Sequence, residues 1–201
     1  MKITLEIVRQ TLRETLGFES FTASFITQAV EEPSLETAGI TKEGVLRYNP
    51  AFVKEYVTCN EDLFSLIFHE LLHPMFGHFI HGRGQLENIA ADAIINAVIS
   101  TLYCQQSRCG NLFKKIYDPK GLQGILRAES RMYNSRYERL YARLYTAGIV
   151  NGGAMTTGEL IQTLKILTQN ESLSRVVLIG SHNDSQHGES GLDRLPGEVL
   201  A

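Results

Sequence analysis

The residues of this sequence best placed to do chemistry are two histidines that stand four positions apart with a glutamate between them, in the stretch Phe68-His69-Glu70-Leu71-Leu72-His73. Positions four apart on an α-helix lie one turn apart and about 40° from each other around its axis, so both imidazoles can reach one metal ion. Glu70 lies about 100° from His69, where it can take a proton from a metal-bound water without being a ligand itself. The pattern predicts a zinc site with His69 and His73 as ligands and Glu70 as general base. Two packed helix histidines are the structural alternative.

A catalytic zinc site usually has three protein ligands and one open position, so the sequence has to supply a third ligand. On a straight helix His78 lies about 180° from His69, on the side away from the ion. The next apolar helix carries polar side chains every four residues on one face: Asn88, Asp92 and Asn96. Because a buried carboxylate is costly without a cation or a hydrogen-bond donor, we predict Asp92 as the third ligand. Glu87 and His78 are alternative ligands, and Asp92 could instead orient a zinc histidine.

Pro74 directly follows the second histidine. Proline has no N–H to bond the carbonyl of Glu70, and it disfavours helical geometry at the residue before it. We therefore expect a kink at His73. If the kink is large, His78 or His81 approaches the metal.

The elements that must position these side chains follow from hydrophobic periodicity and turn residues. The pattern predicts helices over residues 3–16, 61–80, 85–103, 129–145 and 157–169. Strands are expected over residues 24–30, 37–41, 44–48 and 175–179, with a hairpin turn at 42–44. Asn60 is expected to cap the first histidine helix, and Asn49-Pro50 to form a turn. The expected fold is α+β, with a small mixed sheet packed against the His69 helix and the Asp92 helix, and further helices towards the C-terminus.

Several of these pieces together resemble the bacterial metallopeptidase domain that often precedes a von Willebrand factor A-like domain. The matching stretches are residues 48–50, 69–73, 77–78 and 88–96, with weaker matches at 117–119 and 136–141. The resemblance implies a zincin-like fold, a bound zinc ion, and the usual roles for His69, Glu70 and His73. It also implies an AAA-type ATPase or an A-domain protein as a partner in trans, because the chain is too short to hold the A-like domain itself.

Length and composition indicate one soluble cytoplasmic domain over residues 1–201, with its core at about 20–105. The chain is 43% hydrophobic and 20% charged, and no apolar run reaches the roughly 18 residues that cross a bilayer. Three cysteines are too few for a disulfide scaffold and suit a reducing compartment. The net charge of −3 argues against nucleic-acid binding by the whole chain.

Charge is unevenly distributed along the chain. The expected basic helical segment, residues 108–145, contains nine basic and three acidic residues. It can dock an acidic partner or form a solvated helix face. The polar tail from about residue 180 carries His182, Asp184 and His187. These side chains can stabilise an oxyanion, bind a second metal or simply be solvated.

Three functional hypotheses follow. The first is a gluzincin-like zinc metallopeptidase that hydrolyses peptide or protein substrates. Such a substrate would bind as an additional β-strand along an edge strand near residues 44–48. The second is a non-catalytic zinc-binding module that recruits a protein partner. Glu70 favours the enzyme, since a purely structural site needs no base. A zinc hydrolase that acts on a non-peptide amide is a third hypothesis.

Overall fold

The computed structural model describes residues 2–16, 25–41, 43–78, 84–102, 110–145, 155–169 and 176–180. Within these residues the fold is mixed α+β, with seven α-helices, one 3-10 helix and a three-stranded sheet. The predicted α+β class and small mixed sheet are therefore confirmed. No helix in these ranges is both long enough and apolar enough to cross a membrane.

The sheet contains β1 (Gln28–Glu31), β2 (Ala38–Ile40) and β3 (Val45–Tyr48) in the order β1-β3-β2. The predicted hairpin is confirmed, because β2 pairs antiparallel with β3. Its turn requires Gly44, which has φ 77° and approaches Phe25 so closely that a Cβ would lie 2.0 Å from the carbonyl oxygen. β1 pairs parallel with the other side of β3. The prediction that residues 44–48 offer a free edge is therefore wrong, since β3 is central and β1 and β2 form the edges.

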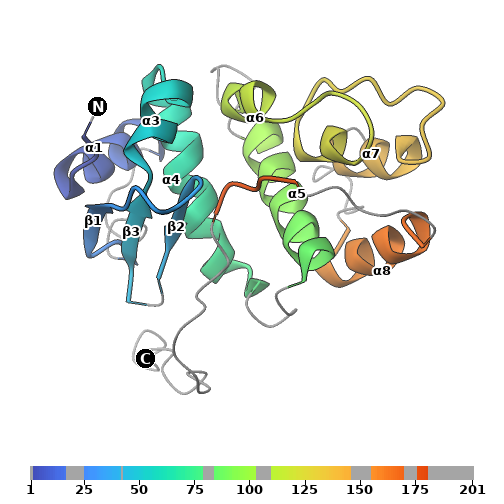
Figure 1. Ribbon diagram of the computed structural model, residues 1–201, viewed down its shortest axis with the longest axis horizontal. Coiled ribbons are helices and arrows are strands. Elements are labelled where there is room, and N and C mark those ends of the chain that lie inside the picture. Colours follow the sequence, from blue (N-terminus) through green and yellow to red (C-terminus); the bar gives the residue numbers. More distant parts are fainter. Residues whose placement is uncertain are drawn as a thin grey trace.

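Two helices form the centre of the molecule: α4 (Asn60–Met75) and α5 (Gln85–Leu102). Every residue of α4 from Asp62 to His73 is buried. The sheet and α1 (Leu5–Leu16) lie on the side of α4 away from α5 (Figure 1). The remaining elements are α3 (Pro50–Tyr56), α6 (Asn111–Ile116), the 3-10 helix η2 (Leu122–Leu126), α7 (Glu138–Tyr145) and α8 (Thr157–Leu167). Of these, η2, α7 and α8 contact α5, so the two central helices join the two sides of the fold (Figure 1).

Three helix ends differ from the prediction. Asn49-Pro50 begins α3 instead of forming an isolated turn, because the Asn49 side chain accepts hydrogen bonds from the first backbone N–H groups of the helix. The N-cap of α4 is Cys59 and not Asn60. The same helix continues through Pro74 but ends at Met75, and the positive φ of Gly77 then turns the chain.

The C-terminal half agrees with the prediction in α8 and departs from it elsewhere. Thr156 caps α8 through a capping box with Glu159, as its sequence indicates. The predicted helix over 129–145 is confirmed only as α7, because Glu129 and Asn134 both have a positive φ of 57°, which breaks a helix. The predicted strand at 175–179 is wrong: residues 176–180 form no strand, and residue 175 lies outside the described part.

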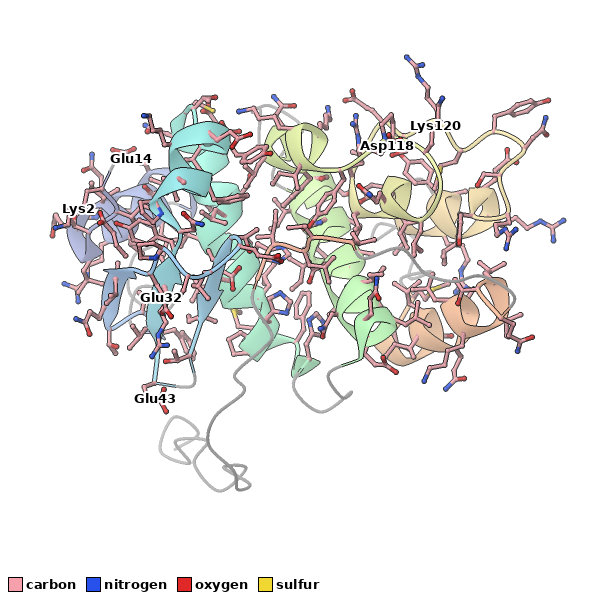
Figure 2. The ribbon with its side chains drawn as sticks, viewed as in Figure 1. Lys2, Glu14, Glu32, Glu43, Asp118 and Lys120 are labelled. Carbon is pink, nitrogen blue, oxygen red and sulfur yellow. The ribbon has the colours of Figure 1, made fainter. Side chains whose placement is uncertain are left out.

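Several basic residues of the 108–145 segment have internal partners. Lys114 pairs with Glu129, and the Arg127 guanidinium donates to the carbonyls of Lys114 and Tyr117. Other charges project from the surface. Glu14 and Glu43 do so around α1 and the sheet, and Lys120 does so beyond α6 (Figure 2). Part of the positive charge predicted to dock a partner therefore stabilises the fold.

Asp62 anchors α6 to the start of α4. Its carboxylate accepts hydrogen bonds from the N–H and hydroxyl of Thr58 and lies 2.5 Å from Lys115 Nζ. Burial alone would raise the pKa of Asp62, but Lys115 and Thr58 hold it below its usual value. Because the folded pKa is the lower one, the carboxylate stabilises the fold above its unfolded pKa of about 3.9, and this contribution is lost as the pH falls further.

We therefore expect Asp62→Asn to lower the free energy of unfolding by about 2 kcal/mol at pH 7. Urea unfolding of the two proteins from pH 7 to pH 3 measures the difference, which should shrink below about pH 4. Asp118→Asn, in an exposed loop, is the control and should change little. A difference that stayed constant down to pH 3 would contradict this role for Asp62.

Candidate metal centre

α4 and α5 bring three metal-ligating side chains together in the interior. His69 and His73 lie on α4 and Asp92 on α5, and all three side chains are buried. The Nε2 atoms of the two histidines are 3.1 Å apart. Asp92 Oδ1 lies 3.5 Å from His73 Nε2 and 3.8 Å from His69 Nε2. The structure thus brings together the three residues predicted as ligands.

The spacing and chemistry of these atoms fit a small cation. Ligands about 2.0–2.1 Å from a tetrahedral ion lie about 3.3 Å from one another, and the three separations bracket that value. Two imidazoles and one carboxylate are also a common donor set for a divalent metal. The buried group of His69, His73 and Asp92 could therefore hold a metal ion.

His69 is held in the orientation that a ligand needs. Asn96 of α5 donates through Nδ2 to the carbonyl of Leu126, at 2.9 Å, which turns its Oδ1 towards His69. His69 Nδ1–H donates to this oxygen at 2.8 Å. The lone pair of a neutral His69 is then on Nε2, facing Asp92 and His73. This hydrogen bond also joins α5 to α4.

His73 has a corresponding partner in His78. The Nδ1 atoms of the two rings are 3.3 Å apart, and His78 Nε2 lies 3.2 Å from Thr157 Oγ1 at the start of α8. When His78 donates to Thr157 and accepts from His73 Nδ1–H, His73 Nε2 is free for a metal. On a straight helix His78 would lie on the side away from the ion. Here α4 ends at Met75 and the chain turns at Gly77, so His78 contacts His73, but through the nitrogen opposite the one that faces Asp92.

Two further ionisable groups lie beside the ligands. Glu70 is 2% exposed and follows His69 on α4. Tyr117, which follows α6, is also buried, and burial together with the charges of Asp92 and Glu70 raises its pKa well above the usual value. Tyr117 therefore stays protonated at neutral pH. In the sequence, Tyr117 belongs only to the weaker matching stretch 117–119, and no role at the site is predicted for it.

The segment of residues 176–180 (the 176–180 segment) passes directly over the site. It crosses between β2 and α5 in Figure 1, where it is drawn in red. The carbonyl oxygen of Ile179 lies 3.0 Å from His69 Nε2. The neighbouring amide of Ile179 donates to the Tyr117 hydroxyl at 3.0 Å. A main-chain oxygen thus joins the group of electron-pair donors around His69, which sequence reasoning missed.

The other candidate ligands lie elsewhere or outside the described residues. Glu87 forms an ion pair with Lys165 of α8, at 3.0 Å, and this partner lowers its pKa. His81 lies outside the described residues, and so do His182, Asp184 and His187. Of the two alternatives that lie in the described residues, Glu87 and His78, His78 is the one near the histidine pair, and it contacts the opposite nitrogen of His73.

Comparison of the chain with protein-family models, with curated proteins and with solved structures gives no match. The geometry of the site therefore carries the functional argument.

The hydrogen bond from His69 to Asn96 predicts a measurable effect on metal binding. Asn96→Leu should weaken zinc affinity by about 10- to 100-fold, because His69 then loses the acceptor that sets its tautomer and ring orientation. A competition titration with a chromophoric chelator measures this affinity. Asn88→Leu, on the same helix but half-buried, is the matched control. Equal affinities for the two variants would show that Asn96 does not orient a ligand.

Proposed function

We propose that this chain is a zinc-dependent metallopeptidase that hydrolyses peptide bonds with Glu70 as general base. The observation that carries the proposal is the buried group of His69, His73 and Asp92, whose separations suit one tetrahedral ion. Zinc is the metal that best suits two imidazoles and a carboxylate at a hydrolytic site. A carboxylate beside such a group, on the same helix, suits proton transfer.

The roles of the residues follow from their places. A bound zinc ion supplies Lewis-acid chemistry, which lowers the pKa of a water and polarises a carbonyl. Glu70 accepts the proton of the attacking water and delivers it to the leaving amine. Tyr117 keeps its proton and offers a hydroxyl to the main chain of a peptide beside the ligands. Asn96 and His78 hold the two histidines in the ligating tautomer.

A zincin-like fold and membership of the bacterial metallopeptidase domains that the motifs resemble are part of the same proposal. They are supported by the packing of the His69 helix against the Asp92 helix, with the small sheet on the other side of α4. An AAA-type ATPase or an A-domain protein in trans is the partner that this proposal favours.

One observation favours a second candidate, a non-catalytic zinc-binding module that recruits a protein partner. Structural zinc sites are closed by four protein ligands, whereas catalytic sites keep one position open. The Ile179 carbonyl lies close enough to His69 to be a fourth ligand. In that case the 176–180 segment would permanently close the site.

Zinc analysis followed by a cleavage assay separates the two candidates. The full chain is loaded with zinc, its metal content is measured, and it is incubated with a mixed peptide library with and without chelator. The peptidase predicts one zinc per chain and cleavage that the chelator abolishes and added zinc restores. Stoichiometric zinc with no cleavage would support the binding module instead.

A further inference from the structure

The 176–180 segment is held to the rest of the molecule in the way that a bound peptide is. Thr37 directly precedes the edge strand β2. Its hydroxyl donates a hydrogen bond to the carbonyl of Leu178, at 3.0 Å, and accepts one from the amide of Gly180, at 3.1 Å. Tyr117 accepts from the amide of Ile179. The main-chain groups of three successive residues are thus bound by side chains, and these contacts do not depend on the side chains of the segment.

Two side chains of the segment, Val176 and Ile179, are buried in the hydrophobic core. Ile179 is fully buried in the hydrophobic core, whereas Val177 is 44% exposed. The segment forms no β-ladder with β2 among the described residues, and its main chain is hydrogen-bonded instead by the side chains of Thr37 and Tyr117. A chain held by contacts to its main chain and by buried aliphatic side chains is attached in the way that a binding groove holds a peptide.

The Ile179 carbonyl lies where a substrate carbonyl is needed. Its oxygen is 3.0 Å from His69 Nε2, near the separation of about 3.3 Å between two ligands of one tetrahedral ion. With the proton of a neutral His69 on Nδ1, the nitrogen and the oxygen both present lone pairs, which favours a cation between them. The position is therefore suited to a carbonyl that a metal polarises.

We propose that the 176–180 segment is a pseudosubstrate that occupies the substrate groove and keeps the centre latent. The inference rests on the proposed peptidase function and specifies its substrate class. Substrates are extended peptides that replace this segment beside β2, with an aliphatic side chain in the pocket of Ile179 and the scissile carbonyl at the place of the Ile179 carbonyl. Displacement of the segment opens the site.

Two substitutions in the full chain release the segment in different ways. Ile179→Ala truncates the most deeply buried side chain of the segment and leaves the groove unchanged, with Val177→Ala on the same segment as the control. Thr37→Val removes both hydroxyl hydrogen bonds to the segment and preserves the shape of the side chain. Its control is Thr168→Val, since the hydroxyl of Thr168, the residue that follows α8, donates to the carbonyl of Leu164 in that helix and not to the segment.

Three measurements report whether the segment has been released from the site, and two of them do not depend on catalysis. Each releasing variant should increase the rate at which EDTA extracts zinc by about tenfold over its control. Amide hydrogen exchange at Ile179 and Gly180 should rise by a similar factor, while exchange in α4 and α5 stays unchanged. Ile179→Ala should also cleave the peptide library about tenfold faster than Val177→Ala.

The contrary outcomes are distinct. If extraction, exchange and cleavage match the controls, the segment does not occlude the site, and the pseudosubstrate fails while any observed cleavage still supports the peptidase. If extraction accelerates but no variant cleaves any peptide, the peptidase fails, and the segment is a cover on a binding site and not a pseudosubstrate. If both variants increase exchange throughout α4 and α5, the segment belongs to the core, and the inference is overturned.

Discussion

Replacing Glu70 with glutamine should abolish peptide hydrolysis and leave zinc binding intact. Glutamine has nearly the same shape as glutamate but cannot accept the proton of the attacking water, so the rate should fall by about 100- to 10,000-fold. The zinc affinity should stay within about twofold of the wild type, because Glu70 is not among the three proposed ligands. Library cleavage and chelator competition on the same preparations measure the two quantities.

Glu87→Gln is the control for the Glu70 variant. It makes the same chemical change on α5, at a carboxylate whose partner is Lys165 and not the site. Its hydrolysis rate should match that of the wild type. A Glu70→Gln protein as active as the control would rule out Glu70 as the base, and with it the mechanism proposed for this centre.

Replacing Asp92 with asparagine should remove most of the zinc affinity. Loss of a residue that only orients a ligand costs about 10- to 100-fold in affinity, so loss of a charged ligand should cost at least about 100-fold. The wild type should gain about 2.7 kcal/mol of unfolding free energy when free zinc is 100 times its Kd, and Asp92→Asn should gain at most about 0.4 kcal/mol at that concentration. Thermal unfolding with added zinc and with chelator measures both gains.

The result for Asp92 has to be compared with that for Asn96→Leu on the same helix. A ligand and an orienting residue differ in magnitude, so the affinity loss should be clearly larger at Asp92 than at Asn96. If zinc stabilised Asp92→Asn as much as the wild type, the carboxylate would not be a ligand. The third ligand would then have to come from a residue other than those proposed.

The part of the site that sequence could predict is the part with helical periodicity. His69 and His73 share a face because they are four residues apart, and Asp92 stood out as a charge in an otherwise apolar helix. Both arguments need only the local geometry of one helix, and both helices are present as α4 and α5. The hairpin of β2 and β3 could also be predicted from the sequence, because a glycine turn separates two short strands.

The rest of the site depends on contacts between residues distant in sequence. His78 reaches His73 only because α4 ends early and Gly77 reverses the chain, which a straight-helix projection cannot show. Tyr117 and Ile179 come to the centre from beyond α6 and from the last described segment. Neither residue belongs to a periodic pattern, and the type of a residue does not predict where its main-chain carbonyl will lie. The predicted strand at 175–179 was wrong for a related reason, since the apolar run is held by side chains and not by a neighbouring strand.

The central claim is that His69, His73 and Asp92 hold one zinc ion, and a crystal structure of the zinc-loaded chain with anomalous data at the zinc edge tests it most directly. The account predicts a single strong anomalous peak between α4 and α5, within about 2.0–2.2 Å of both Nε2 atoms and an oxygen of Asp92. A peak bound by other residues, or none at this place in crystals grown with stoichiometric zinc, would contradict it.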